Sequence, residues 1–164
     1  MKRCHTRQYG NKAMGFTLIE LVVTISIIAI LAAVALPRYI ALQTQARAAK
    51  MQGIYGGIRS AAMLAHAQAI ATNATAAATI TMEGAVIDQV NGYPTADLTG
   101  IIRALQLDST NDQVTLSAGG AAAGSTITID INGATTAANC RVSYTSALAN
   151  ASPTIALPIA PDCS

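Results

Sequence analysis

Glu20 is the only ionisable side chain between Phe16 and Leu36, a long and otherwise almost entirely apolar stretch. A carboxylate at the centre of a membrane helix costs roughly 2.5 to 3.5 kcal/mol, so such a residue is a functional candidate whose partner must be identified. Thr17, Glu20 and Thr24 are spaced i, i+3 and i+7, which places all three on one helical face. The spacing predicts a polar stripe that faces another helix.

The stretch from Phe16 to Leu36 is long enough to cross a membrane as a single helix. At about 1.5 Å per residue it is roughly 30 Å long, which matches the hydrocarbon core of a bilayer. Pro37 follows and lacks the N–H that would bond the carbonyl of Ala33, so a kink is predicted there. The preceding segment, residues 1–15, is basic and has no acid, which favours a cytoplasmic leader; its cations are Lys2, Arg3, Arg7 and Lys12.

The order of these features carries a resemblance. A basic leader ending in Gly15, then Phe16-Thr17-Leu18-Ile19-Glu20 and an apolar helix broken at Pro37, resembles the class III signal of type IV prepilins and of type II secretion pseudopilins. The resemblance implies cleavage between Gly15 and Phe16 by a prepilin peptidase and N-methylation of the new Phe16 amine. It also implies that Glu20 pairs with that amine on a neighbouring subunit during assembly. Pairing would offset the desolvation of both charges and favour one register.

The function implied is that of a structural subunit, a pilin, that polymerises through its N-terminal helix into a type IV pilus. The expected partners are other copies of the chain, the prepilin peptidase and methyltransferase, the inner membrane and the pilus assembly machinery. The subunit would reside in the bacterial inner membrane and then in an extracellular surface filament that supports adhesion, with motility as a further role. The alternatives are a type II secretion pseudopilin and a monomeric membrane-anchored periplasmic binding domain. Glu20 argues against the monomeric domain, because a plain anchor has no use for a carboxylate.

The C-terminal part of the chain indicates a branch of the family. The turn Gly92-Tyr93-Pro94-Thr95, with Cys140 in a β segment and Cys163 near the end, looks like the mannose-sensitive haemagglutinin group of type IV pilins. Major pseudopilins instead resemble one another in a calcium-binding acidic loop, which Asp162 alone does not make. A pilin is therefore favoured over a pseudopilin.

Cys140 and Cys163 are the only cysteines left once the leader, which contains Cys4 and His5, is removed. An even pair in an exported domain predicts a disulfide, and pilins have a C-terminal disulfide loop, so chemistry and resemblance agree. In the entropic model, a bridge closing a loop of this length contributes about 3 kcal/mol to stability. A catalytic thiolate would need an activating histidine, and the remaining one, His66, falls in the long helix, where we expect a structural or exposed role.

Charge and motif content exclude several functional classes. The chain has ten Lys and Arg against eight Asp and Glu, and loss of the leader leaves six against eight, so nucleic acid is not expected as the main partner. An acid-free basic stretch on the helix is expected to face anionic lipid or the acids of a neighbouring subunit; it consists of Arg38, Arg47, Lys50 and Arg59. No nucleophile motif, phosphate loop or metal-ligand spacing is present, and the acids Asp108, Asp112 and Asp130 are scattered. We therefore predict no enzyme activity, cofactor or metal.

The helix is expected to continue to about Ala71, with residues 16–37 in the membrane and residues 38–72 forming an amphipathic half. The buried face is predicted from helical spacing to contain Met51, Ile54, Ile58, Ala61 and Ala65. Small residues recur every four positions at Gly53, Gly57, Ala61, Ala65 and Ala69. Such a ridge allows close packing, either beneath the chain's own sheet, which we favour, or in a filament.

Residues 73–164 are expected to form a globular αβ-loop and an antiparallel sheet that ends in the disulfide loop. Residues 73–78 should be a linker, and residues 79–90 a strand or extended loop with Ile80, Met82 and Val86 partly buried. Thr95 is predicted to cap a short helix that ends near Gln106 and has an apolar face of Leu98, Ile101, Ile102 and Leu105.

About four antiparallel strands are predicted after this helix. They begin near Val114, cover Thr126–Ile131 and Arg141–Tyr144, and end with an edge strand at Thr154–Leu157. One-sided strands need one apolar partner, and the amphipathic half of the helix can supply it. The predicted class is α+β, in the manner of the type IV pilin fold.

Overall fold

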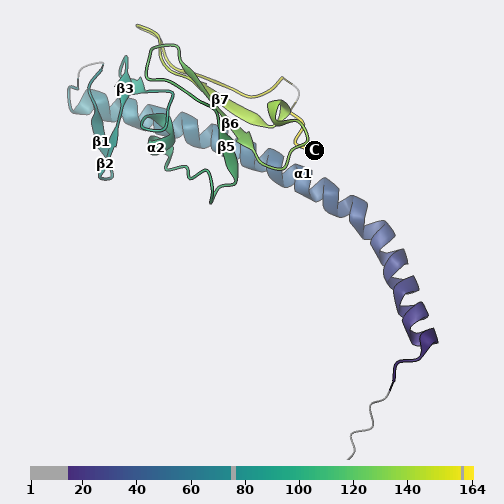
Figure 1. The fold of residues 1–164 in the computed structure, drawn as a ribbon. Helices are drawn as coiled ribbons and strands as arrows, with labels where there is room; N and C mark the ends of the chain where they lie inside the picture. The colour runs from purple at the N-terminus through teal and green to yellow at the C-terminus, as the bar shows by residue number, and fades with distance from the viewer. Residues whose placement is uncertain (1–14, 75–76, 160) are drawn as a thin grey trace, which may run out of the picture. The chain divides into compact units, whose positions relative to one another are not determined.

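The computed structural model describes residues 15–74, 77–159 and 161–164. Within them, the long helix α1 (Leu18–Ala71) comes first, and a series of short strands with one short helix follows (Figure 1). The predicted leader, residues 1–14, and residues 75–76 of the predicted linker lie outside the described residues. The chain divides into two compact units, residues 1–39 and residues 40–164, and each is described by itself.

Helix α1 confirms the predicted element almost to the residue. It begins at Leu18, two positions after the expected start, and ends at Ala71 as expected. Pro37 lies inside the helix, whose assignment is continuous across it. The predicted kink at Pro37 therefore stays a prediction.

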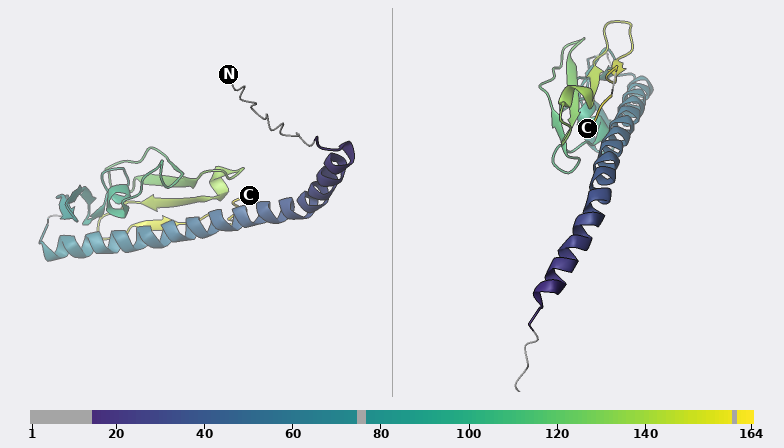
Figure 2. Two further views of the ribbon diagram at one scale, coloured as in Figure 1. Left: turned by 90° about the horizontal axis from the view of Figure 1, so that it is seen from below. Right: turned by 90° about the vertical axis from the view of Figure 1, so that its right-hand side faces the viewer.

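The amphipathic half of α1 buries the face that its sequence period indicates. The predicted residues Met51, Ile54, Ile58, Ala61 and Ala65 are all buried, together with Ala62 and Ala69. Figure 2 shows the strands lying along one side of this part of the helix. The ridge of small residues is only partly used here, because Gly53 is exposed whereas a Cβ at Gly57 would lie 2.8 Å from Leu105 Cδ1.

A four-stranded antiparallel meander confirms the predicted sheet. Its order is β5 (Val114–Leu116), β6 (Thr126–Ile131), β7 (Arg141–Thr145) and β8 (Thr154–Ala156). Strand β6 alternates as a one-sided strand should, with Ile127, Ile129 and Ile131 all buried. Strand β8 lies at one edge, where Pro153 and Pro158 flank it and keep it short.

Two small hairpins replace the single extended segment predicted for residues 79–90. Strand β1 (Ile80–Met82) pairs with β2 (Ala85–Ile87), and β3 (Gln89–Val90) pairs with β4 (Tyr93–Pro94). Each turns through two residues at positive φ, Glu83-Gly84 and Asn91-Gly92, as a type I′ turn requires. The predicted partial burial of Val86 is wrong, because the register pairs Ile80 with Ile87 and these two side chains are buried while Val86 is exposed.

The predicted cap at Thr95 is also wrong. Helix α2 is shorter than expected (Ile101–Leu105), its N-cap is Gly100, and Leu98 is exposed. Thr95 is buried and donates its hydroxyl to Asp97 Oδ1 at 2.8 Å. The same oxygen accepts the backbone N–H groups of Thr99 and Gly100 at 3.1 and 2.8 Å, so an Asp97-centred turn precedes the helix.

The core of residues 40–164 joins α1, α2 and the inner face of the sheet. Tyr144 is the largest of its fully buried side chains and donates its hydroxyl to the carbonyl of Pro94 at 2.7 Å, which ties β7 to β4. Burial raises the pKa of the Tyr144 hydroxyl, and nearby Tyr93 raises it further. The loop before β6 also packs closely against the backbone of Ala96, since a Cβ on Gly119 would lie 1.8 Å from the Ala96 carbonyl oxygen. Only glycine fits there.

Candidate assembly site

The start of α1 gathers the residues that the sequence nominated for processing and assembly. Gly15 and Phe16 precede the helix in an irregular segment, and both are exposed. Thr17 stands immediately before the first helical residue, and Glu20 lies in the first turn. The proposed cleavage bond, the future amine and the carboxylate therefore occupy one short segment.

Thr17 and Glu20 form a capping box. The Glu20 Oε2 atom accepts the backbone N–H of Thr17 at 2.9 Å and the hydroxyl of Thr17 at 2.7 Å. In return, the backbone N–H of Glu20 donates to Thr17 Oγ1 at 3.3 Å. A helix start leaves four N–H groups without helical partners, and this reciprocal pattern satisfies two donors. Glu20 thus has a local role at the helix terminus besides the pairing predicted for it.

The other polar groups of the apolar segment are satisfied within the helix. Thr24 donates its hydroxyl to the carbonyl of Leu21 at 2.8 Å, and Ser26 donates to the carbonyl of Val22 at 2.7 Å. Among the described residues, no partner other than Thr17 contacts the Glu20 carboxylate, whose Oε1 atom accepts no hydrogen bond. Glu20 is the ionisable group of this segment, and its Oε1 atom keeps full acceptor capacity for another molecule.

Apolar surface surrounds this carboxylate on all sides of the helix. Every residue from Gly15 to Gln43 is exposed, and the fractions for Phe16 and Leu18 reach 76% and 80%. Among the described residues, α1 is a helix long and apolar enough to cross a membrane. Exposed apolar area of this size marks a surface that lipid or another protein covers.

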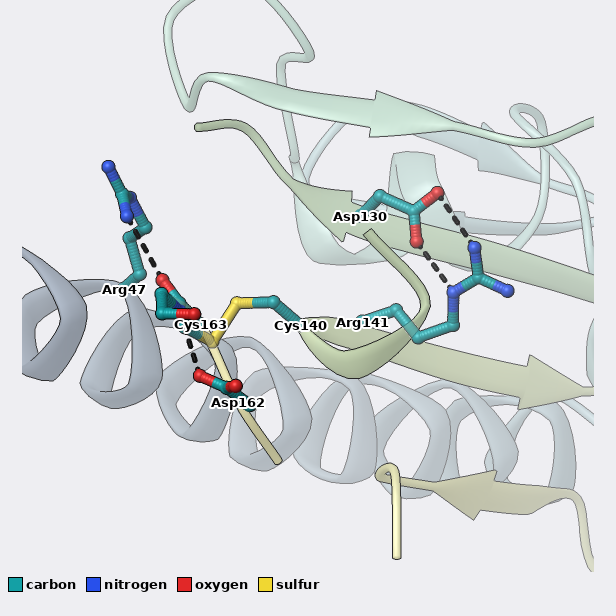
Figure 3. Close-up of a disulfide and its surroundings, with 7 residues drawn as sticks. Arg47, Asp130, Cys140, Arg141, Asp162 and Cys163 are labelled. Carbon is teal, nitrogen blue, oxygen red and sulfur yellow. Dashed lines mark hydrogen bonds and ion pairs between the residues drawn. A yellow bond between two sulfur atoms is a disulfide. The ribbon is translucent and has the colours of Figure 1, made fainter. Parts of the chain in front are cut away.

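The predicted disulfide is present at the other end of the chain. Cys140, which directly precedes β7, is bridged to Cys163, and both are buried (Figure 3). The bridge fixes the C-terminal segment to the short 3-10 helix η1 (Ala137–Asn139), where the N–H of Asp162 donates to the carbonyl of Asn139 at 3.0 Å. The N–H of Thr135 donates to the carbonyl of Ser164, so the last residue is held as well.

Arg47 connects the disulfide loop to α1. Its Nη1 atom donates to the carbonyl of Cys163 at 3.0 Å, as Figure 3 shows. One turn on, Lys50 Nζ donates to the carbonyl of Asp112 in the turn before β5. Two members of the basic stretch thus bind backbone carbonyls of the globular part and no carboxylate. Arg141 instead pairs with Asp130 across β7 and β6, with Nε 2.7 Å from Oδ1.

His66 has the structural role expected of it. Its ring stacks on Tyr93 with centroids 4.0 Å apart, and Nδ1 lies 2.8 Å from the carbonyl oxygen of Gly92. In the part of the chain that the structure describes, no group of three His, Cys, Asp or Glu side chains is placed to hold a metal ion.

Sequence reasoning nominated Glu20 as a partner for another subunit but missed its capping role. The signal was available, because Thr17-x-x-Glu20 before an apolar run is the sequence pattern of a capping box. It also missed the carbonyl contacts of Arg47 and Lys50, for which a sequence offers no signal, because the acceptors are backbone atoms far along the chain.

Comparisons with known proteins agree with this site. The family model described as the prokaryotic N-terminal methylation motif matches residues 11–36, which include Gly15, Phe16 and Glu20. The chain is 47% identical over 58 residues to the type IV narrow pilus major component PilA5 of Thermus thermophilus, and the match covers 35% of this chain. The chain spans about half the length of that relative, 50% of it. No solved structure matches the chain.

These findings concern segments of different length. The motif model describes the segment that contains the junction and the carboxylate, and the 58-residue match to the pilin relative is longer than that segment. The α+β arrangement, with a long apolar N-terminal helix and antiparallel sheets, is type IV pilin-like. The matched methylation motif, the pilin relative and this architecture together make the chain similar to type IV pilins.

Proposed function

We propose that this chain is a structural pilin that polymerises through its N-terminal helix into a type IV pilus on the cell surface. The observation that carries the proposal is the first part of α1, where every residue is exposed and one carboxylate lies beside the predicted cleavage bond. A helix of this kind is stable in lipid, and removing it from lipid requires another apolar surface. Copies of the same helix supply that surface.

Processing comes first in the proposed sequence of events. A prepilin peptidase cleaves between Gly15 and Phe16, and the new Phe16 amine is methylated. The subunit then waits in the inner membrane, held by residues 16–37. The methylation motif that matches residues 11–36 supports this step.

Assembly follows through Glu20. Moving a helix from lipid into a filament exchanges one apolar environment for another, so the hydrophobic effect provides little net drive or register. A carboxylate and an amine that are both desolvated provide directional attraction instead, and an unpaired one costs several kcal/mol. We propose that the pilus assembly machinery adds each subunit so that its Phe16 amine meets the Glu20 of a neighbour.

Two neighbouring functions make different predictions. A pseudopilin would act in secretion and not in a long surface filament, and a monomeric anchored domain would stay in the membrane. The pilin relative supports the pilus hypothesis. We propose adhesion, with motility as a further role, for the assembled filament and not for the single subunit. We propose no enzymatic function for the subunit.

The test is to shear surface material from cells that produce the full chain and to measure its intact mass. We expect filaments that contain the chain without its first fifteen residues and with one added methyl group. The membrane fraction of the same cells is the control for processing without assembly. Recovery of the processed chain only from the membrane would contradict the pilus and favour the anchored domain.

A further inference from the structure

The charges of residues 40–164 are distributed unevenly. The formal charges of helix α1 from Ile40 onward are all cations, namely Arg47, Lys50 and Arg59, whereas the chain after the helix has two cations and seven acids. Those acids are Glu83, Asp88, Asp97, Asp108, Asp112, Asp130 and Asp162. Among the described residues, the pair Arg141–Asp130 is the single ion pair, so helix cations and domain acids do not neutralise one another within one copy.

Two of the helix cations open onto a cleft. Its volume is about 530 Å³, and Arg47 and Lys50 line it together with the amides of Gln43, Gln113 and Asn132 and the backbone of Gly133. The lining consists of cations, amides and apolar groups, without an Asp or Glu side chain. Every charged group in this cleft is thus a hydrogen-bond donor.

Both cations are held in place and retain free donors. Arg47 is half-buried and uses Nη1 for the Cys163 carbonyl, which leaves Nε and Nη2 near Gly133. Lys50 is half-buried and donates to the Asp112 carbonyl. An ammonium has three donors and a guanidinium five, so each has capacity for an incoming acceptor. Ordered donors of this kind lose little side-chain entropy when a carboxylate binds.

An exposed acid lies at the opposite end of the same unit. Glu83 is in the turn of the β1–β2 hairpin, and that hairpin packs on Ala65 and Ala69 of α1. Eighteen to twenty-two helical residues separate Arg47 from this contact, which is roughly 30 Å along the helix axis. Figure 1 shows β1 and β2 at one end of this unit and the chain's C-terminus toward the other.

We propose that the cleft of Arg47 and Lys50 binds a carboxylate of a second copy of this chain, supplied by the end of the domain that contains Glu83. Two different patches at opposite ends of one copy form a head-to-tail contact, and repeated head-to-tail contacts produce open helical filaments. Opposite charges at the two patches orient the incoming copy and disfavour the reversed arrangement. The inference rests on the proposed filament and adds a second contact, outside the membrane helix.

The test compares filament yield for charge reversals in the full chain. Lys50→Glu places a carboxylate in the cleft, and we expect at least about a fivefold lower ratio of sheared filament to membrane subunit. Lys50→Gln removes the charge without repulsion and should have a smaller effect. The membrane level of each variant reports subunit stability, and Arg59→Glu, at an exposed arginine of α1 that does not line the cleft, is the matched reversal.

The decisive variant combines Lys50→Glu with Glu83→Lys. Restored yield in this double variant supports the contact between copies. Asp108 distinguishes a contact within one copy, because its N–H donates to Asp112 Oδ2 beside the cleft of the same copy. Restoration by Asp108→Lys but not by Glu83→Lys would overturn the proposal.

The remaining outcomes also decide. Normal yield of Lys50→Glu filaments, or loss that neither second-site change restores, would overturn the cleft contact while leaving the pilus intact. Absence of the wild-type chain from sheared filaments would instead contradict the proposed function itself. Wild-type filaments that carry the contact should also fragment more readily at high salt, because screening weakens exposed ion pairs.

Discussion

The two units of this chain treat apolar side chains in opposite ways. In residues 15–39 every residue is exposed, whereas in residues 40–164 Met51, Ile58 and the isoleucines of β6 have 3% exposure or less. The second unit has a core, a sheet and a disulfide, so it buries apolar side chains within itself. The first unit requires a covering surface. A chain that keeps both kinds of region can fold before it assembles, because folding and assembly use different apolar surfaces.

The largest expected effect is at Glu20, which we propose pairs with the Phe16 amine of a neighbouring copy. Glu20→Ala should abolish or strongly reduce filaments while membrane insertion and cleavage continue, since loss of a carboxylate makes the helix easier to hold in lipid. The measurement is processed subunit in the membrane against subunit in sheared filaments. Normal filament yield from Glu20→Ala would remove the pairing mechanism.

The capping box supplies a matched control for that prediction. Glutamine at the same position can still accept from Thr17, so Glu20→Gln retains the cap and loses the charge. Thr17→Ala does the reverse, because the carboxylate stays and the hydroxyl partner is removed. We expect Glu20→Gln to resemble Glu20→Ala and Thr17→Ala to assemble. Assembly of Glu20→Gln at the wild-type level would assign Glu20 to capping alone.

The second expected effect concerns the disulfide in residues 40–164. Cys140→Ser should lower the free energy of unfolding by about 2 to 5 kcal/mol, the usual cost of losing a native disulfide from a small exported domain. Denaturant unfolding of the full chain in detergent measures it. Cys163→Ser and the double variant should be equally affected, since each removes the same bridge. Strongly additive effects would show that the cysteines act through packing.

Sequence patterns predicted long-range organisation better than local geometry. The helix limits, the four-stranded meander and the disulfide follow from periodicity and residue type, which many residues reinforce together in α1. The predicted cap at Thr95 was wrong because Asp97 Oδ1 accepts the backbone N–H groups of Thr99 and Gly100, and the Thr95 hydroxyl donates to that same oxygen. The predicted burial of Val86 was wrong because the two-residue turn sets a register in which its neighbour Ile87 faces inward. The predicted burial of Leu98 was wrong because α2 begins only at Ile101. At the assembly site, residue types were predictable and their mutual hydrogen bonds were not.

A smaller effect is expected at Tyr144. Tyr144→Phe leaves the Pro94 carbonyl without its donor, which should cost about 1 to 3 kcal/mol. Because the pKa of Tyr144 is raised on folding, its contribution is fully present below the unfolded value of about 10 and is lost as pH rises above it. The phenylalanine variant should therefore lose less stability than the wild type at alkaline pH. The exposed Tyr39→Phe is the control, and equal alkaline slopes in all three proteins would contradict the assignment.

The smallest effect is expected at Gly53, on the exposed face of α1, and it tests whether other copies bury this face as they would bury the first unit. A Cβ on Gly53 meets no atom within 4 Å, so Gly53→Ala should raise subunit stability by up to about 1 kcal/mol. Gly57→Ala is the matched change on the covered face, where Leu105 must move, and should gain nothing. Thermal unfolding of both variants measures the difference. A filament yield that falls for Gly53→Ala would add this face to the surfaces that copies cover.

The bridge between Cys140 and Cys163 also has a mechanical consequence. In the proposed filament, tension would load each subunit, and an unbridged C-terminal segment could separate from β7 and η1 as an extended chain. The bridge spans a sequence separation of 23 residues, which fully extended would reach roughly 80 Å. With the loop closed, that length is not available as slack. Under load, residues 141–162 therefore cannot extend until the disulfide is reduced, and any lengthening that begins at the C-terminus must start with residues before Cys140.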